Sequence, residues 1–391
     1  MKKICFVTTV YFGLEHFMLP IVKQLHETEK FEITFICNYN ERFANDLPEW
    51  IRYIPVKMKR GYDIGFMKII SKLKKIFKKE KFDIVAYSNE NAALYAAVAA
   101  YKAKVPIRLY NQWGVRYRNM HKGIKYFLFK IVEKITCKCS TDTRCQSPLH
   151  RELCIKEKLF DQNNSKVLGI GGTIGVDFNE YDLTKKDIWN INFREKYSIP
   201  SDSFVFGFCG RITKDKGIRE ILIAFNKLKE EFHEISLLLV GDIDVNNGLN
   251  KKIIKAIYND PQIICVGKLN SDEVKYAYAA MNVYLHPTYR EGFGLAIQEA
   301  GAMELPVITS KIPGASEVLV EGQSCELVPI KNADQLYQKM QSFVRDPDKA
   351  KKMGHEAYLR VKKEFEREKM VAQQTADYIE LANRFNEGTQ C

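Results

Sequence analysis

Short apolar runs alternate with amphipathic segments along most of the chain. Apolar runs typical of buried strands occupy residues 3–8, 32–37, 82–87, 107–110 and 141–145 in the first half, and 204–209, 236–240 and 282–286 in the second. Helical periodicity lies between them, for example at 16–27, 91–102 and 218–229. Alternation of this kind is typical of α/β proteins, in which helices cover both faces of a parallel sheet.

The alternation starts again at Phe204, after an acidic and polar stretch from Asp177 to Ser203 that we interpret as the connection between two domains. A chain of 391 residues with 46% hydrophobic side chains is globular and longer than one core usually supports. We therefore expect an N-terminal domain at 1–190, a C-terminal domain at 201–366 and a final segment at 367–391.

The most informative segment follows the strand that Pro287 ends. It places Glu291 before the turn Gly292-Phe293-Gly294, a helix start at Leu295, and Glu299 eight residues after the first carboxylate. Glycines let backbone N–H groups approach a ligand, and the helix directs the positive end of its dipole to the same place. The two carboxylates would repel a phosphate but accept hydrogen bonds from hydroxyl groups beside it. A nucleotide sugar supplies both groups.

A second glycine loop joins the strand at 204–209 to the helix at 218–229. It contains Gly210, Arg211 and Lys216, in the strand, loop and helix order of a nucleotide-binding unit. Each charge-assisted hydrogen bond to a phosphate contributes about 1.5–3 kcal/mol, so two cations can hold a diphosphate without a metal. A surface turn with solvated cations is the alternative.

The run from Tyr284 to Gly294, continuing through Glu299-Ala300 and Pro306-Val307-Ile308 to Pro313-Gly314 and Glu317, resembles the retaining glycosyltransferases of family 4. This family, also called glycosyl transferases group 1, includes bacterial enzymes of polysaccharide biosynthesis. The resemblance implies the GT-B fold, in which two Rossmann-like, doubly wound domains face each other across a cleft. It also implies that a last helix near 369–386 returns to the N-terminal domain.

The same resemblance assigns the site. Arg211, Lys216 and Glu291 are the expected catalytic residues, with the two cations on the donor diphosphate and Glu291 on sugar hydroxyls. Residues expected to bind the donor are Gly13, Gly210, Val266, Lys268, Gly292, Phe293, Gly294, Leu295 and Glu299. Val266 and Lys268 match the place where the family binds the base. Many relatives carry His-Gly where this chain has Trp113-Gly114, and Trp cannot accept a hydrogen bond from a sugar hydroxyl.

The resemblance implies transfer from a nucleotide sugar, a UDP-sugar by expectation, to a saccharide or lipid-linked acceptor. Glu299 should lie on the ribose side, so no carboxylate pair serves a double displacement. The leaving phosphate oxygen would then act as the base toward the acceptor. A nucleotide-sugar 2-epimerase has the same architecture and is the main alternative. A non-catalytic partner in a polysaccharide assembly complex is a third reading.

Positive charge is concentrated in residues 51–150, where 22 basic side chains accompany 6 acidic ones. Two amphipathic segments contribute to it. In the first, Phe66, Met67, Ile69, Ile70, Leu73, Ile76 and Phe77 share one helical face; in the second, Ile124, Phe127, Leu128, Ile131, Val132 and Ile135 do so. Each Lys or Arg gains about 1 kcal/mol at an anionic leaflet. We expect residues 57–81 and 121–138 to contact an anionic membrane surface, with a merely solvated face as the alternative. No nucleic-acid-binding motif is present.

Nothing in the sequence favours a metal cofactor or a secreted protein. The ten cysteines lack paired spacing, which indicates free thiols in a reducing compartment. Cys137, Cys139, Cys145 and Cys154 fit no common zinc pattern, and Asp242-Ile243-Asp244 follows a strand, where acidic loop residues are ordinary. The apolar run at 4–10 is interpreted as a strand, not a signal sequence. We expect a cytoplasmic protein at the inner face of the plasma membrane.

Overall fold

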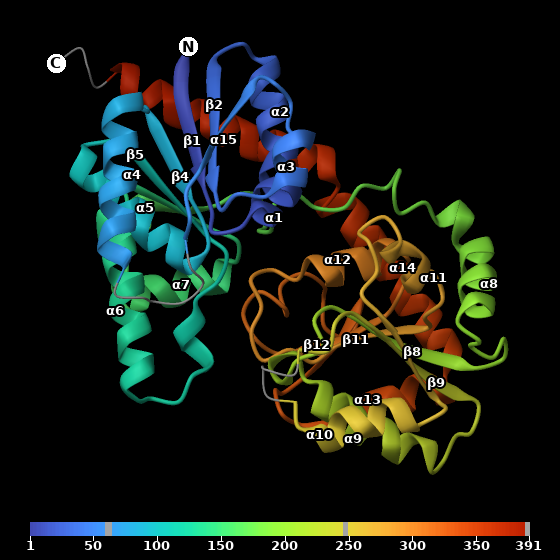
Figure 1. The fold of residues 1–391 in the computed structure, drawn as a ribbon. Coiled ribbons are helices and arrows are strands. Elements are labelled where there is room, and N and C mark those ends of the chain that lie inside the picture. Colours follow the sequence, from blue (N-terminus) through green and yellow to red (C-terminus); the bar gives the residue numbers. More distant parts are fainter. Residues whose placement is uncertain (59–64, 245–248, 388–391) are drawn as a thin grey trace. The chain divides into compact units, whose positions relative to one another are not determined.

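The computed structural model describes residues 1–58, 65–244 and 249–387. Within it the chain divides into two compact units. Unit 1 comprises Met1–Ile174 and Glu368–Cys391, and unit 2 comprises Gly175–Arg367. Each unit contains one parallel sheet with helices on both faces (Figure 1). The expected class, two Rossmann-like α/β domains, is confirmed.

Unit 1 is built on a seven-stranded sheet in which every strand pair is parallel. In spatial order the strands are β3 (Ile51–Pro55), β2 (Phe31–Cys37), β1 (Lys2–Val7), β4 (Ile84–Tyr87), β5 (Ile107–Gln112), β6 (Asp142–Cys145) and β7 (Ser165–Val167). The order reverses beside β1. Ligands of open parallel sheets bind near such a switch point, at the carboxyl ends of the strands.

Helices cover both faces of this sheet (Figure 1). One face carries α4 (Phe66–Glu80), α5 (Glu90–Ala103), α6 (Ile124–Cys139) and α7 (Pro148–Lys156). The other carries α2 (Leu19–Glu27), α3 (Glu41–Asp46) and α15 (Arg367–Glu387). Short helical turns are α1 (Tyr11–Gly13), the π-helical η1 (Leu14–Met18), η2 (Arg116–Asn119) and η3 (Gln162–Asn164). The core of each face is aliphatic and aromatic, as the apolar strand runs predict.

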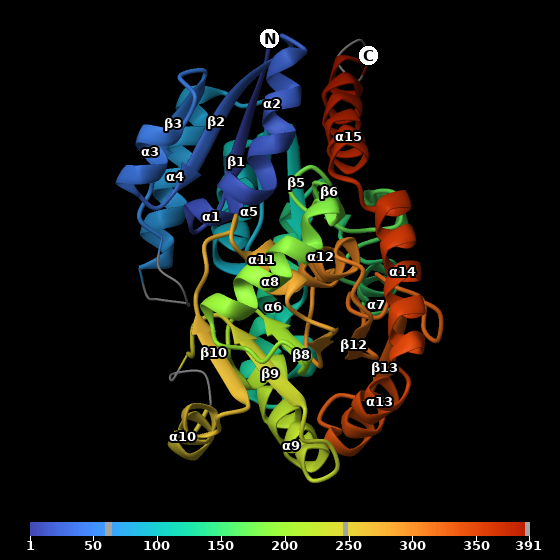
Figure 2. The same ribbon diagram turned by 90° about the vertical axis from the view of Figure 1, so that its right-hand side faces the viewer.

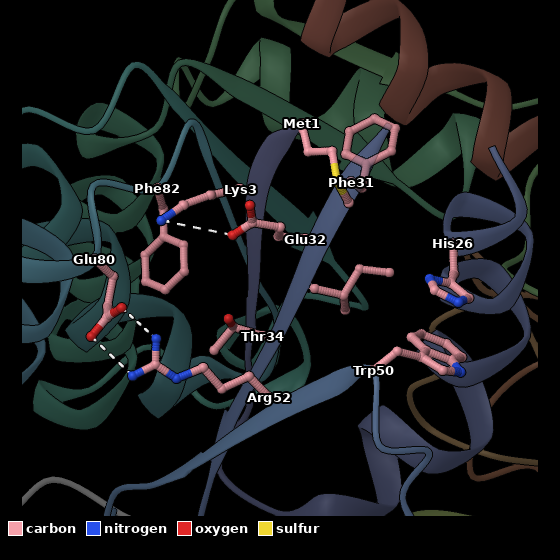
Figure 3. Close-up of a pocket in the computed structure, with 11 residues that line it drawn as sticks. Met1, Lys3, His26, Phe31, Glu32, Thr34, Trp50, Arg52, Glu80 and Phe82 are labelled. Atoms are coloured by element: carbon pink, nitrogen blue, oxygen red, sulfur yellow. Dashed lines mark hydrogen bonds and ion pairs between the residues drawn. The ribbon is translucent and has the colours of Figure 1, made fainter. Parts of the chain in front are cut away.

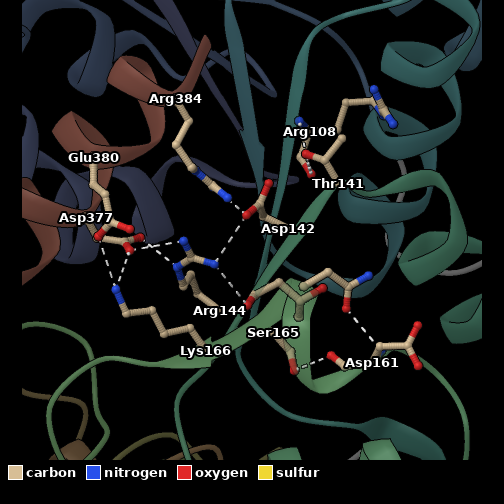
Figure 4. Close-up of polar contacts among 12 residues, drawn as sticks. Arg108, Thr141, Asp142, Arg144, Asp161, Ser165, Lys166, Asp377, Glu380 and Arg384 are labelled. Atoms are coloured by element: carbon tan, nitrogen blue, oxygen red, sulfur yellow. Dashed lines mark hydrogen bonds and ion pairs between the residues drawn. The ribbon is translucent and has the colours of Figure 1, made fainter. Parts of the chain in front are cut away.

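Ion pairs attach α15 to the edge of the unit 1 sheet (Figure 4). Arg144 on β6 donates to both carboxylate oxygens of Asp377, at 2.6 and 3.0 Å, and both side chains are buried. Arg384 donates to Asp142 at 2.6 Å, and the Lys166 ammonium lies 3.2 Å from Glu380. A buried pair of this kind is costly to break, because the remaining charge has no partner. The last helix therefore packs on the N-terminal sheet.

Unit 2 contains a six-stranded parallel sheet, seen from a second direction in Figure 2. Its order is β10 (Ile263–Gly267), β9 (Ile235–Val240), β8 (Phe204–Cys209), β11 (Val283–His286), β12 (Val307–Ser310) and β13 (Cys325–Val328). One face carries α9 (Ile218–Lys229), α10 (Lys251–Asn259) and α13 (Ala333–Arg345). The other elements are η4 (Leu183–Lys185), α8 (Lys186–Lys196), η5 (Lys214–Lys216), α11 (Val274–Ala279), α12 (Leu295–Ala302) and α14 (Pro347–Glu364).

The boundary between the units differs from the one expected at residues 190–201. It lies between Ile174 and Gly175, and the stretch expected to be a connection is part of unit 2. The physical reason is α8, whose Arg194 is buried and donates to the carbonyl oxygens of Ala280 at 3.0 Å and Ser203 at 3.0 Å. The polar composition of residues 177–203 gave no indication that they contain a helix packed on unit 2.

The two basic helices of unit 1 behave differently from each other. On α4 the predicted apolar face is the packed one, since Ile70, Leu73 and Phe77 are buried. On α6 most of the predicted apolar face is exposed, and the helix contacts the core through another side. Residues 59–64 of the expected membrane segment lie outside the described residues. Among the helices that the structure describes, none is both long enough and apolar enough to cross a bilayer.

Candidate functional site

The candidate site of unit 2 lies at the carboxyl edge of its sheet, where the loops after β8, β9 and β11 meet. The first two loops touch through their backbones: the Ile212 N–H donates to the Asp242 carbonyl oxygen at 2.9 Å. A Cβ atom on Gly241 would lie 2.0 Å from the Gly210 carbonyl oxygen. The backbone contact leaves no room for a side chain there, which fixes the loop that carries Arg211.

The loop after β8 ends at Gly217, directly before α9. Gly217 has φ +75°, a conformation that L side chains rarely adopt, and an added Cβ would lie 2.2 Å from the Pro287 carbonyl oxygen. The close approach brings the Lys216 ammonium to 2.8 Å from Oε2 of Glu291. One glycine thus places the expected cation beside the first expected carboxylate.

Asp215 joins the same two loops. Its carboxylate accepts from Thr213 Oγ1 at 2.6 Å and from Arg290 Nε at 3.0 Å, and its carbonyl oxygen accepts from the Tyr289 N–H at 2.8 Å. Tyr289 also donates through its hydroxyl to Glu220 at 2.6 Å. These bonds fix the backbone on both sides of Glu291.

Glu291 is held as an ionised acceptor. Burial by itself would raise its pKa, but the Lys216 charge and the hydrogen bond with His286 outweigh burial, so the pKa lies well below its ordinary value. His286 Nε2 is 2.8 Å from Oε2, and the Gly292 N–H donates to Oε1 at 3.2 Å. Burial lowers the pKa of His286, which favours the neutral ring. A carboxylate with these partners is a weak base.

Helix α12 directs its N-terminus toward this loop. Gly294 occupies the N-cap position with φ +62°, and no side chain of the described residues caps the helix there. Phe293 is buried against Phe365, at 5.6 Å between ring centroids, and Leu295 opens the helix. The first-turn N–H groups and the helix dipole therefore favour an anion at this end.

Glu299 lies on the same helix, in an environment unlike that of Glu291. The Tyr278 hydroxyl donates to its Oε2 at 3.0 Å, and Tyr181 is a second hydrogen-bond partner. Burial raises the pKa of Glu299 to about 7, and the two tyrosine hydrogen bonds oppose this only in part. Glu299 and Glu291 thus differ in protonation near neutral pH.

The remaining predicted residues are spread more widely. Arg211 has a side chain that is 62% exposed, and among the described residues its ion pair is a long one, 3.9 Å, with Asp244. Val266 and Lys268 lie at the end of β10, two strands away from β8. Gly13 belongs to unit 1, where the Trp113 ring lies 3.2 Å from the position of an added Cβ. The structure groups Lys216, Gly292 and Gly294 with Glu291, and the site roles of all these residues stay predictions.

Four residues that hold the two carboxylates and their loops were not predicted from the sequence: His286, Asp215, Tyr181 and Tyr278. A signal for one of them was present, because His286 is the last residue of its strand and so lies at the ligand edge of the sheet. For Tyr181 there was none, since it comes from a stretch interpreted as a connection.

Other groups considered from sequence do not form a metal cluster in the described parts of the chain, where no three His, Cys, Asp or Glu side chains gather suitably. Cys145 and Cys154 instead donate to Gln112 Oε1, at 3.3 and 3.6 Å. Asp244 of the acidic loop faces Arg211.

A cavity of about 260 Å³ lies in unit 1 at the amino ends of β1, β2 and β3 (Figure 3). Its polar walls are paired, since Arg52 Nη1 is 2.5 Å from Glu80 and the Lys3 ammonium is 3.7 Å from Glu32. The Trp50 ring stacks on His26 at 4.1 Å. The cavity lies at the amino edge of the unit 1 sheet, at the other end of the strands from the carboxyl edge where ligands of such sheets bind, so we assign it no part in the site.

Known proteins match this chain over both units. The family model described as "Glycosyl transferase 4-like" matches residues 3–147, and the model described as "Glycosyl transferases group 1" matches residues 190–360. The second match contains Arg211, Lys216, Glu291 and Glu299.

Two relatives and one solved structure extend the comparison. The chain is 32% identical over 312 residues to the capsular polysaccharide biosynthesis glycosyltransferase CapM of Staphylococcus aureus, covering 79% of this chain and 80% of that one. It is 26% identical over 298 residues to the UDP-Gal:alpha-D-GlcNAc-diphosphoundecaprenol alpha-1,3-galactosyltransferase of Escherichia coli, covering 74% of each. The crystal structure of Anabaena Alr3699/HepE with UDP-glucose has a TM-score of 0.76 at 17% identity, covering 97% of this chain and 100% of that one, a likeness of fold alone. The chain therefore belongs to the glycosyl transferases group 1 family and has the GT-B fold.

Proposed function

We propose that this chain is a retaining, metal-independent glycosyltransferase of cell-surface polysaccharide biosynthesis. It moves a hexosyl or N-acetylhexosaminyl group from a UDP-sugar to a saccharide or lipid-linked acceptor. The observation that carries the proposal is the cluster of Lys216, Glu291 and His286 beside the N-terminus of α12, which no described side chain caps. A cation, an ionised acceptor and a helix dipole together suit a sugar diphosphate.

The donor diphosphate is the proposed ligand of the helix N-terminus and the two cations. The first-turn N–H groups of α12 follow Gly294 and lie at the positive end of the helix dipole, where an anion gains most. Arg211 is largely exposed and, in the part of the chain that the structure describes, has one long ion pair, so it can turn toward a phosphate. Lys216 must share its ammonium between Glu291 and the ligand. Arg suits bidentate phosphate binding, and Lys adds a point charge.

Glu291 acts in this proposal by positioning the sugar, not by attacking it. Its low pKa and its bonds to Lys216 and His286 make it a poor nucleophile. The departing phosphate oxygen accepts the acceptor's proton on the face that the diphosphate leaves, so configuration at the anomeric carbon is retained. Arg211, Lys216 and the first-turn N–H groups of α12 stabilise the charge that develops on that oxygen.

The relatives support the choice of donor and acceptor class. The name of the E. coli relative specifies UDP-Gal and a diphosphoundecaprenol-linked sugar, and the S. aureus relative is named for capsular polysaccharide. A polyprenyl-linked acceptor resides in a membrane. We therefore propose that the protein works as a peripheral protein at the cytoplasmic face, where its basic surface meets anionic lipid.

The proposal is tested by incubating the purified chain with a panel of UDP- and GDP-sugars and following both thermal stabilisation and slow hydrolysis of the donor. Arg211→Ala and Lys216→Ala should each lower the rate of donor hydrolysis by orders of magnitude, and a chelator should leave that rate unchanged. Wild-type rates in both variants would contradict the proposal. Formation of an epimeric sugar nucleotide from donor alone would identify a 2-epimerase instead.

A further inference from the structure

Helix α6 carries a row of exposed apolar side chains. Ile124, Phe127, Leu128, Ile131 and Ile135 are between 41% and 89% exposed. Their spacing of three, four and seven residues places them on one face of the helix, and we name this row the apolar stripe. Scattered exposed apolar residues are ordinary, but a continuous row of five on one helix marks an interaction surface.

The position of α6 in unit 1 does not depend on the apolar stripe. The helix packs on the core through Tyr126, Phe129 and Val132, and Glu133 and Cys137 are buried on the same side. It lies beside α5, which separates it from α4 in the helical layer (Figure 1). The stripe is therefore surface that remains after the unit has folded, and substituting it should leave the fold intact.

Positive charge surrounds the apolar stripe. Lys122, Lys125, Lys134 and Lys138 are exposed, whereas Lys130 is paired with Glu157 at 3.2 Å. The single acidic residue of α6, Glu133, is buried on the opposite side. Lysines beside an exposed apolar face are the pattern of helices that lie in a membrane interface.

Helix α4 is similar in sequence but offers no comparable face. Its central apolar side chains Ile70, Leu73 and Phe77 are buried, and its surface consists mainly of lysines. Only Phe66 and Met67, at its beginning, are large exposed apolar residues. α4 can attract an anionic surface, but α6 can also insert into one.

We infer that α6 is the element that inserts into the membrane: the helix lies in the plane of an anionic bilayer, with the apolar stripe at the boundary of headgroups and acyl chains. The flanking lysines contact acidic headgroups. This inference rests on the proposed membrane association and says which residues produce it. A second copy of the chain suits the stripe poorly, because an isologous contact would bring the lysine rows of two copies together.

The test measures flotation of the full-length chain with vesicles of phosphatidylcholine, alone or mixed with phosphatidylglycerol. The stripe variant combines Phe127→Ser, Leu128→Ser and Ile131→Ser. The matched control combines Ile188→Ser and Ile191→Ser, which replace apolar residues of α8 that are exposed to a similar degree. A charge variant combines Lys125→Gln, Lys134→Gln and Lys138→Gln. Thermal unfolding and donor turnover are recorded for each protein.

Wild type and control should float with the phosphatidylglycerol vesicles, and the stripe variant should partition at least about tenfold less. The charge variant should bind less at low salt and show a weaker salt dependence. Unfolding and donor turnover should not change. The inference would be overturned if the stripe variant floated as well as wild type, or if wild type did not bind the vesicles. It would also be overturned if wild type formed a dimer that did not respond to salt and that the stripe variant did not form. Loss of turnover in every protein would instead count against the proposed function.

Discussion

The protonation of Glu299 should control how tightly the enzyme binds its donor. Burial raises the pKa of Glu299 to about 7, against the opposing effect of hydrogen bonds from Tyr278 and Tyr181. If Glu299 accepts hydrogen bonds from the donor ribose, only its ionised form binds well, because a protonated carboxyl offers fewer acceptor sites. The donor would then bind mainly to those protein molecules in which Glu299 is ionised.

The size of the effect follows from that pKa. About one tenth of Glu299 is ionised at pH 6 and about nine tenths at pH 8, so the apparent Kd for the donor should fall about tenfold over this range. A UDP-sugar is a suitable probe because its diphosphate, esterified at both ends, does not titrate there. Burial lowers the pKa of His286, which displaces the titration of that ring toward lower pH than the titration of Glu299.

The assay is calorimetric titration of UDP-sugar at several pH values, in buffers of different ionisation enthalpy. Binding below pH 7 should release a proton, and binding at pH 8 should release almost none. The control Glu299→Gln retains the size of the side chain but does not titrate, so its weaker affinity should be independent of pH. Equal wild-type affinity at pH 6 and pH 8, with no proton released, would refute the reasoning.

The same group makes a prediction for stability, whose sign follows from linkage. The folded-state pKa of Glu299 lies above its ordinary value, so the folded protein binds the proton more tightly than the unfolded chain. Its contribution to the free energy of unfolding therefore falls, by up to about 3 kcal/mol, as the pH rises from about 4.5 through 7. Saturating donor should offset part of this loss above pH 7.

Three further predictions concern single residues. Lys216→Met should lower the single-turnover rate by about a hundredfold or more, and an unchanged rate would remove Lys216 from catalysis. Gly217→Ala should destabilise the protein by about 2–3 kcal/mol in urea unfolding, because its φ is +75° and the new Cβ would meet the Pro287 carbonyl; wild-type stability would contradict this. Burial raises the pKa of Glu133 to about 7, against the hydrogen bonds from Gln112 and Tyr110, so the free energy of unfolding of wild type should fall from about pH 5.5 to 8. Glu133→Gln should make the free energy of unfolding less dependent on pH over this range. An unchanged pH dependence in the variant would exclude Glu133 as its source.

The sequence predicted best where pattern and packing coincide. The helix expected at 218–229 is α9, and the strand expected at 282–286 is β11 within one residue. In these elements the apolar positions that define the pattern are the ones that pack into the core. By contrast, β3 and β7 were not predicted, because edge strands are short and only partly buried and so lack a clear alternation of apolar and polar residues.

Helix α6 shows a second limit. Its sequence indicates which residues share a face, but not which face meets the core. Tyr126, Phe129 and Val132 pack on the core, and of these three Val132 alone belongs to the predicted row. Tertiary contacts decide this, and they are not local. The partners of the carboxylates were missed for the same reason: Tyr181 and Glu299 are 118 positions apart in the chain.

The two ends of unit 2 are joined by hydrogen bonds. Val176 and Glu366 form a parallel bridge, in which the Val176 N–H donates to Phe365 at 2.8 Å and the Arg367 N–H donates to Val176 at 2.9 Å. Unit 2 is thus inserted into the sequence of unit 1, and the segments that enter and leave it are hydrogen-bonded to each other. A fragment covering residues 175–367 begins and ends at this bridge, so it should fold as an autonomous domain. Because its two ends lie close together, linking them should also permit circular permutation, with new termini placed elsewhere in the domain.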